Sequence, residues 1–265
     1  MITRRPLLLL ASLATFGMLA VTAVPLVDAA SGKGLVAVAG ATGRTGVPVV
    51  EQLVARGFQV RALVRDVTAA KGRFPPGVEL VSADVRDPKS LDAALRGAKY
   101  LISTIGAGGG PKADPSNGAR EIDNLGVANL AKAAKTAGVS QMVLVSSATV
   151  TKAAENTLAF MRPILAAKFE GEQALRKSGV PYTIVRPGGL VDETGGKLAV
   201  TFAQGDTTSG RIPRADVATI CIEALDRDTA LSRTIEVYSA ESPAPNDWAK
   251  SFGGLKADAA QAARH

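Results

Sequence analysis

Short apolar runs alternate with longer amphipathic segments along most of the chain. The runs are about four or five residues long, which is typical of strands buried on both faces of a sheet. The segments between them have apolar residues at helical spacing, as at Ile122, Leu125, Leu130 and Ala134. We expect strands at residues 35–39, 59–64, 78–82, 100–103, 142–145, 182–185 and 234–238, and helices at 47–54, 89–95, 121–137, 158–177 and 214–227.

This alternation predicts an α/β fold of the Rossmann type, a doubly wound parallel sheet with helices on both faces. A chain of 265 residues is long enough to bury one sizeable core, so a single domain is expected. That domain is expected over residues 32–242, with small substrate-side elements near its C-terminal end. Residues 243–265 are expected to form an Ala-rich helix or a loose C-terminal tail.

The first 31 residues are expected to be a signal or targeting segment outside this fold. Arg4-Arg5 precede a charge-free apolar run from Leu7 to Val24, and small residues follow it. A basic start, an apolar middle and a small-residue exit are typical of such segments. Cleavage after Ala23 or near Ala29 and retention as a membrane anchor are both open. The destination is also open between a bacterial periplasm and the plastid or thylakoid of an alga.

Composition narrows the classes of partner. The formal net charge is +7 and aromatic residues make up 4%. Because the chain has no cluster of basic residues with aromatic residues between them, nucleic acid is not expected as a partner. The positive excess suits an anionic cofactor. Cys221 is the single cysteine, expected as a small buried apolar residue, so an intrachain disulfide is excluded. His265 is the single histidine, so no His/Cys metal site is expected.

A glycine-rich stretch between the first strand and the first helix is the strongest functional signal. Its glycines are spaced Gly-x-x-Gly-x-x-Gly within the sequence GATGRTG. Glycines allow a sharp turn and a close approach to phosphate, and the helix that follows directs free N–H groups at an anion. We therefore predict that a dinucleotide pyrophosphate binds at Gly40, Thr42, Gly43, Arg44, Thr45 and Gly46.

With these residues the sequence resembles the extended and atypical short-chain dehydrogenase/reductase superfamily, particularly its NAD(P)H-binding, NmrA-like and flavin reductase-like members. The resemblance covers about residues 34–240. It implies adenine contacts at Asp84 and Val85, ribose contacts at Ser103 and Thr104, and a nicotinamide-side loop at Pro187, Gly188 and Gly189. A purely structural role in a turn remains an alternative for each of these positions.

The end of the second strand bears on the choice between NADP and NAD. Arg65 directly follows Val64, and Arg44 in the glycine loop can reach the same region. Two guanidiniums suit the 2′-phosphate of NADP, because the planar fork pairs with phosphate bidentately. Asp66 would instead accept hydrogen bonds from the ribose 2′-OH of NAD if the strand ended one residue later. We expect NADP(H), with NAD as the alternative.

The superfamily resemblance also implies a catalytic Ser, Tyr and Lys, of which only part is present. Ser146 and Ser147 stand at the position of the family Ser, and Lys168 corresponds to the family Lys. The residue four before it is Ile164 rather than Tyr, so the usual proton donor is missing, a loss worth about 10²–10⁴-fold. Lys168 is expected to hold ribose hydroxyls, or else to pair with Glu172 on the helix surface.

Two functions remain, and we favour the first. An NADP(H)-dependent oxidoreductase would pass hydride to a small conjugated acceptor such as a quinone, flavin or carbonyl, with Ser146 or Ser147 polarising it or water supplying the proton. A non-catalytic NADP(H)-sensing scaffold or assembly factor would instead bind a protein partner. A monomer or dimer is expected, and membrane contact is expected only through an uncleaved N-terminal segment.

Overall fold

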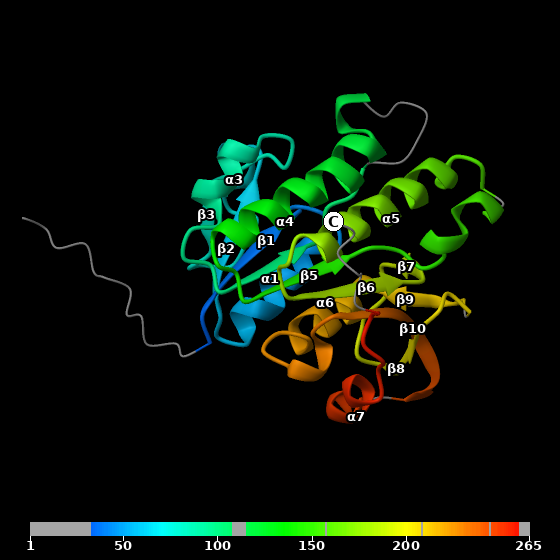
Figure 1. Ribbon diagram of the computed structural model, residues 1–265. Coiled ribbons are helices and arrows are strands. Elements are labelled where there is room, and N and C mark those ends of the chain that lie inside the picture. Colours follow the sequence, from blue (N-terminus) through cyan, green and yellow to red (C-terminus); the bar gives the residue numbers. More distant parts are fainter. Residues whose placement is uncertain (1–32, 108–114, 157, 208, 244, 260–265) are drawn as a thin grey trace, which may run out of the picture. The chain divides into compact units, whose positions relative to one another are not determined.

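The computed structural model describes residues 33–107, 115–156, 158–207, 209–243 and 245–259. They form an eight-stranded sheet with helices on both faces (Figure 1) and a separate pair of short strands. The strand order of the large sheet is β3-β2-β1-β4-β5-β6-β10-β8. The predicted Rossmann-type α/β fold is confirmed. The expected targeting segment, residues 1–31, lies outside the described residues.

The large sheet is parallel except at one edge. Its strands are β1 (Leu35–Ala39), β2 (Gln59–Val64), β3 (Glu79–Ser82), β4 (Tyr100–Ser103), β5 (Gln141–Val145), β6 (Tyr182–Pro187), β8 (Leu198–Ala203) and β10 (Arg233–Pro243). At its centre, Val38 of β1 lies opposite Ala62 of β2 and Ile102 of β4. Strand β8 pairs antiparallel with β10, whereas the sequence predicted a purely parallel sheet.

Two further strands, β7 (Gly189–Val191) and β9 (Arg211–Pro213), form the small second sheet. They were not predicted, because each has three residues and lies beside glycine or proline, where apolar periodicity cannot be recognised. Strand β8 was missed for a related reason. It is half-exposed at the sheet edge, with Val200 as its single buried residue, so its pattern is not that of a buried strand.

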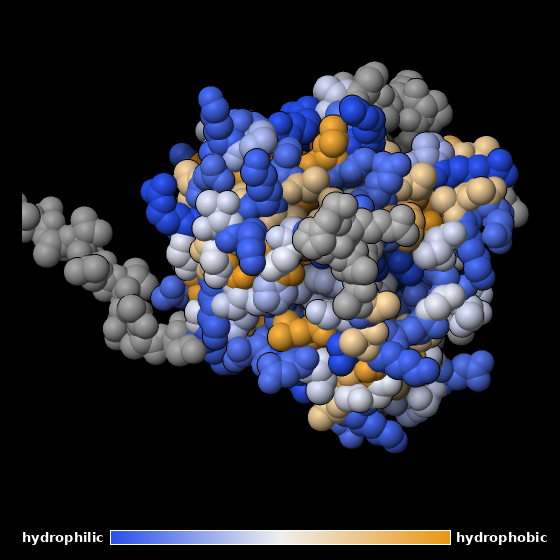
Figure 2. Space-filling model, viewed as in Figure 1, coloured by the Kyte–Doolittle hydropathy of each residue, from blue (hydrophilic) through white to orange (hydrophobic). Residues whose placement is uncertain are grey.

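The helices cover the two faces of the sheet in separate groups. On one face the core contains side chains of α1 (Gly46–Ala55), α6 (Arg214–Glu223) and α7 (Trp248–Gly253), and on the other those of α3 (Pro88–Ala94), α4 (Val127–Thr136) and α5 (Met161–Lys177). The surface seen in Figure 2 is mainly hydrophilic, with small separate apolar patches. Within the described residues, no helix has both the length and the apolarity needed to cross a membrane.

The predicted helix 121–137 begins differently from an ordinary α-helix. Residues Arg120–Gly126 form a π-helix, η2, which continues into α4. A Cβ on Gly171 of α5 would lie 2.1 Å from the Asp123 carbonyl oxygen, so the two helices meet where α5 has no side chain. The wide turn directs Asp123 inward, and its side chain is 1% exposed. Such single π-turns are frequently found at functional sites.

Residues 245–259, within the expected tail, pack against the sheet. Phe252 of α7 is fully buried and meets the Phe202 ring edge-on with centroids 5.0 Å apart. Beyond the helix, the Asp258 carboxylate accepts hydrogen bonds from the Tyr182 hydroxyl at 2.9 Å and the Thr234 backbone N–H at 3.0 Å. This segment is therefore held to β6 and β10 by both apolar and polar contacts.

Candidate functional site

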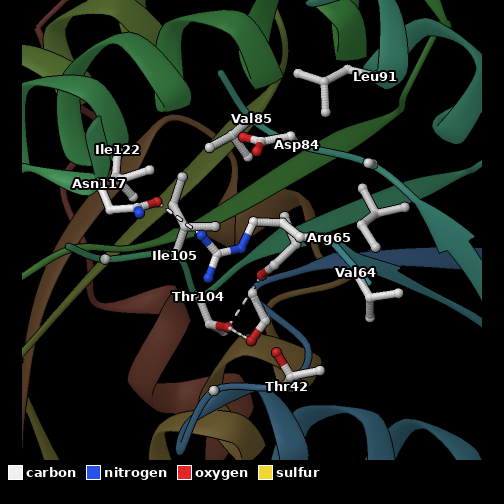
Figure 3. Close-up of a pocket in the computed structure, with 16 residues that line it drawn as sticks. Thr42, Val64, Arg65, Asp84, Val85, Leu91, Thr104, Ile105, Asn117 and Ile122 are labelled. Atoms are coloured by element: carbon white, nitrogen blue, oxygen red, sulfur yellow. Dashed lines mark hydrogen bonds between the residues drawn. The ribbon is translucent and has the colours of Figure 1, made fainter. Parts of the chain in front are cut away.

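A pocket of about 410 Å³ opens at the carboxyl ends of β1 to β4 (Figure 3). Open α/β sheets bind ligands at this edge, where the strand order reverses between β1 and β4. The structure brings seven of the sequence-predicted residues onto its wall: Gly40, Thr42, Gly43, Arg65, Asp84, Val85 and Thr104. Ile105 and Gly106, which directly follow the predicted ribose contacts, also line it, as do Asn117 and Ile122, which were not predicted as site residues.

The three glycines of the loop have different roles. Gly40 has a positive φ of 77°, and a Cβ there would lie 2.9 Å from the backbone of Thr104 and Ile105. A Cβ on Gly46 would lie 2.1 Å from the Gly40 carbonyl oxygen, so both of these positions need glycine for the turn itself. Gly43 lines the pocket, and the only close neighbour of a Cβ there would be the Gly40 oxygen at 3.1 Å.

The first turn of α1 fits an anionic ligand. Thr45 occupies the N-cap position but makes no side-chain cap, and the turn has no acidic residue. The Val47 N–H donates to the Gly43 carbonyl oxygen at 3.0 Å and Pro48 has no N–H, so it is chiefly the positive end of the helix dipole that faces the glycine loop. With a bare backbone at Gly43, the loop leaves room for the close approach that the predicted pyrophosphate contact requires.

Arg44, Thr45 and Gly46 were predicted to bind the cofactor but are not on the pocket wall. Arg44 forms an ion pair with Asp192, which follows β7, and Arg214 donates to the same carboxylate at 2.6 Å. Thr45 is 9% exposed. Gly46 is the first residue of α1 and packs against the backbone of Gly40 and Ala41 in the glycine loop.

The two residues that follow β2 point in different directions. Figure 3 shows Arg65 in the middle of the pocket, and its Nη1 donates to Asn117 Oδ1 at 2.8 Å. Asp66 is the N-cap of the short helix α2 (Val67–Ala70), and its carboxylate accepts the Ala69 N–H at 3.0 Å. Asp66 is thus committed to the helix start and is absent from the described pocket wall.

Asp84 is held by the residue two positions later. Arg86 Nε donates to both Asp84 carboxylate oxygens, at 2.9 and 3.1 Å. This hydrogen bond lowers the pKa of Asp84, against the opposing effect of burial. Val85 uses its carbonyl oxygen to accept the Asn129 amide at 2.8 Å. Both residues are therefore in fixed positions at the edge of the pocket predicted for adenine.

Two predicted serines carry buried hydroxyls without a partner. Ser103 at the end of β4 is 0% exposed and Ser146 after β5 is 6% exposed, and neither Oγ has a hydrogen-bond partner among the described residues. An unsatisfied buried hydroxyl costs about 1–3 kcal/mol, and neither serine is on the described pocket wall. Ser147 is half-buried, and its Oγ donates to the Ala148 carbonyl oxygen at 3.2 Å.

Lys168 is paired with an acid that the sequence did not single out. Its Nζ lies 2.7 Å from Asp123 Oδ1, and the other carboxylate oxygen accepts the Ala107 N–H at 2.9 Å. A Cβ on Gly106, which lines the pocket, would lie 3.6 Å from the Lys168 ammonium. Glu172, the alternative partner of Lys168, instead binds arginines deep in the core. Helical periodicity gave no signal for Asp123, because the π-turn changes which side chains face inward.

The predicted nicotinamide-side loop is closely packed. A Cβ on Gly188 would lie 2.4 Å from the Gly210 carbonyl oxygen and 2.6 Å from the Tyr238 ring. The Pro187 carbonyl oxygen accepts the Ala148 N–H at 2.9 Å, which ties this loop to the segment after Ser147. Gly189 begins β7 and is exposed. None of the three residues is on the described pocket wall.

A buried ionic cluster that the sequence did not predict lies beneath this region. Arg186 of β6 donates to Glu172 at 2.9 and 2.7 Å, and its Nη1 lies 3.4 Å from Glu236 and 3.7 Å from Asp206. Asp206 in turn accepts the backbone N–H groups of Thr149 and Thr151. Burial would raise the pKa of Asp206, but the Thr151 hydroxyl, these backbone N–H groups and the Arg186 charge together outweigh it, and the pKa is lowered.

No metal centre is evident in this part of the molecule. Among the described residues, no group of three or more His, Cys, Asp or Glu side chains is placed to hold a metal ion. Cys221 is fully buried in α6, and burial raises its thiol pKa to about 12. It is therefore protonated at neutral pH and unsuited as a nucleophile.

Comparison with known proteins gives a consistent family. A family model described as NAD(P)H-binding matches residues 40–228. An uncharacterised chloroplastic protein of Arabidopsis thaliana is 37% identical over 219 residues, which is 78% of this chain and 77% of that protein. Sanguinarine reductase of Eschscholzia californica is 32% identical over 248 residues, covering 79% of this chain and 90% of that protein.

A more distant sequence relative and a solved structure are also similar to this chain. A photosystem II assembly factor of Trieres chinensis is 28% identical over 204 residues, covering 74% of this chain and 60% of that protein. Among solved structures, the anaerobillin reductase ChuY of Escherichia coli O157:H7 has a TM-score of 0.66 and 25% sequence identity, covering 80% of this chain and 100% of that one. Reductases are thus present among both the sequence relatives and the structural neighbours.

Proposed function

This chain belongs to the NAD(P)H-binding family of atypical short-chain dehydrogenase/reductase proteins, and from that premise we propose that it is an NADP(H)-dependent oxidoreductase. Its acceptor would be a small conjugated molecule such as a quinone, a flavin or a carbonyl compound. The observation that carries the proposal is the Ser146 hydroxyl, which is 6% exposed and unpartnered among the described residues. It follows β5, beside the strands whose ends form the pocket.

Two features of the pocket support NADP(H) over NAD(H). Arg65 lies inside it and donates its hydrogen bond to the neutral amide of Asn117, while the Asp84 carboxylate, which Arg86 holds, attracts it only at longer range. Asp66, the candidate acceptor for a ribose 2′-OH, is used as a helix cap. A guanidinium that is not hydrogen-bonded to a carboxylate favours a phosphate over a hydroxyl, since the bidentate pair of charged groups is the stronger contact.

The proposed chemistry assigns a separate task to each side chain. A bound nicotinamide would supply the hydride. Ser146 would donate a hydrogen bond to the acceptor atom on which negative charge develops, and water would supply the proton that completes the reduction, because position 164 is Ile. Lys168, fixed at 2.7 Å by Asp123, would hold ribose hydroxyls and orient the ring. Ser147 would be a second hydrogen-bond donor to the acceptor.

The proposed acceptor side is apolar where the superfamily has its Tyr. Ile164 lies one helical turn before Lys168 on α5 and is half-buried. Just before it in the chain, Leu158 is 55% exposed and Phe160 is 59% exposed. An apolar approach with one buried hydroxyl suits a flat conjugated acceptor, whose reduced form is stabilised by delocalisation and needs little help from a general acid.

The test is NADPH oxidation with a panel of quinones, flavins and carbonyl compounds. We expect turnover with at least one acceptor, and a drop in kcat of about tenfold or more in Ser146→Ala, the scale expected for loss of one donor to a developing charge. The matched control is Ser140→Ala, because Ser140 is exposed and lies at the start of β5, away from the pocket. Equal losses in both variants would contradict the role of Ser146.

A second candidate is a non-catalytic NADP(H)-sensing scaffold. Ile164 in place of a proton donor favours it, as does the relation to a photosystem II assembly factor. In that case a protein partner would bind more tightly to one nucleotide-loaded form. Tight NADPH binding without oxidation by any acceptor of the panel would reject the enzyme and support the scaffold.

The N-terminal segment is proposed to direct export or organelle targeting. Several relatives are chloroplastic proteins, which supports a plastid for this chain too. Mass spectrometry of protein recovered from its own cells would test this, since cleavage near Ala23 or Ala29 would yield a defined new N-terminus. Recovery of an intact N-terminus in a soluble fraction would contradict both the cleaved and the anchored form.

A further inference from the structure

Three arginines surround the glycine loop, and their charges are compensated to different degrees. Arg44 forms an ion pair with Asp192, whose carboxylate also accepts from Arg214. Arg65 donates to the neutral side chain of Asn117. Arg73 donates through Nη2 to the Thr42 carbonyl oxygen at 3.1 Å, and no ion pair to it is found among the described residues. Arg73 is therefore a cation without a carboxylate, in contact with the loop.

The fold holds Arg73 at this position. It lies in the turn after α2, three residues beyond Ala70, which is 1% exposed. The next residue, Phe74, packs against the core cluster beneath α1. At the other end of the same element, Asp66 caps the helix. The two guanidiniums of Arg65 and Arg73 thus stand at either end of one short, anchored element.

Thr42 connects this element to the pocket. It lines the pocket with Gly43 and Arg65, and in Figure 3 it lies on one side of Arg65 while Asp84 and Val85 lie on the other. The Arg73 guanidinium has five N–H donors in a planar fork, and the Thr42 carbonyl takes one of them. Arg73 is not itself on the described pocket wall but is exposed next to Thr42, which is, and its remaining donors have no hydrogen bond to a carboxylate among the described residues.

From this geometry we propose that Arg73 is the second guanidinium of a 2′-phosphate clamp, with Arg65 as the first. This inference rests on the proposed binding of NADP(H). It replaces Arg44 in that role, because Arg44 is already paired with Asp192, whereas Arg73 has no ion pair among the described residues. A dianionic phosphate binds most strongly to cations that are not already hydrogen-bonded to a carboxylate. Arg73 is thus a residue that determines cofactor specificity.

The experiment is titration of NADPH and NADH by nicotinamide fluorescence in wild type, Arg73→Ala, Arg44→Ala and Arg65→Ala. Arg73→Ala should weaken NADPH binding about tenfold and NADH binding by less than about twofold, because only NADPH has the extra phosphate. Arg44→Ala should change the ratio of the two dissociation constants by less than about twofold. Arg73→Lys keeps the charge without the fork and should fall between wild type and Arg73→Ala.

The matched control is Arg96→Ala, which removes the same charge from an exposed side chain between α3 and β4, on the sheet edge opposite the pocket. It should leave both affinities unchanged. A wild type that binds neither nucleotide would overturn the proposed function and this inference together. A wild type that prefers NADPH, with Arg73→Ala retaining that preference, would overturn this inference alone. Loss of the preference in Arg44→Ala but not in Arg73→Ala would return the role to Arg44.

Discussion

Among the described residues, Arg186 is the cation that three buried carboxylates share, and replacing it by Met removes that cation. The Arg186 side chain is 6% exposed, Glu172 and Glu236 are 0% exposed and Asp206 is 1% exposed. Arg176 remains to pair with Glu172 at 3.1 Å, whereas Glu236 loses its cation. Breaking a buried ion pair by removing one partner costs about 3–5 kcal/mol, because the other charge stays buried.

That loss is a large part of the stability of a domain, which is about 5–15 kcal/mol. Urea denaturation at about pH 7.5 should therefore show a clearly lower midpoint for Arg186→Met. The matched control is Arg120→Met, because Arg120 is 73% exposed and pairs with Glu121 on the surface. It should cost less than about 0.5 kcal/mol.

The pH dependence gives a second, independent readout. Burial raises the pKa of Glu236 even beside Arg186, and removal of the arginine should raise it further. An acid whose pKa is higher in the folded than in the unfolded state destabilises the fold at a pH above both pKa values, where it is ionised. At a pH below both pKa values it is protonated in both states, and the destabilisation is absent. The loss in Arg186→Met should therefore shrink when the pH is lowered to about 5.5. A loss no larger than that of Arg120→Met, or one that is the same at both pH values, would refute this reasoning.

Three other predictions follow from single positions. Gly46→Ala places a Cβ 2.1 Å from the Gly40 carbonyl oxygen. In a denaturation experiment it should lower the free energy of unfolding by about 1–3 kcal/mol, and in a fluorescence titration it should abolish nucleotide binding. An unchanged affinity would contradict the glycine-loop geometry. The Cys221 thiol, with a pKa of about 12, should not react with a thiol reagent at neutral or mildly alkaline pH until the protein unfolds, so prompt labelling of native protein would show that α6 opens. Burial first, and then the Asp258 carboxylate, raise the pKa of Tyr182 to about 12, so its phenolate band should be missing from an ultraviolet titration below that pH and appear earlier in Asp258→Asn.

The sequence predicted the buried part of the sheet well and its edges poorly. Strands such as β1 and β5 are apolar on both faces, and their runs agreed with the structure to within about one residue. The edge strand β8 is half-exposed and pairs with β10, which begins 30 residues after the end of β8 at Ala203. Such a pairing depends on the tertiary fold, which a local pattern does not reveal.

The candidate site shows the same division. The glycine loop and Arg65 were found because their spacing relative to a strand end has a direct physical meaning. Asp123 was missed because a π-turn redirects it. Arg44 forms its ion pair with Asp192, which is far away in the chain, so the sequence of the glycine loop could not predict this pair. Arg73 was missed because its contact with Thr42 exists only once α2 and the turn after it are folded.

The position of Asp258 has a consequence for the order of folding during synthesis. Its carboxylate accepts from Thr234, which precedes it by 24 residues, and from Tyr182, which precedes it by 76. On the ribosome, β6 and β10 emerge before this partner, so we expect their half of the sheet to be less stable until Asp258 has been made. Premature termination anywhere before Asp258 should therefore leave a nascent chain that chaperones and proteases recognise as incomplete.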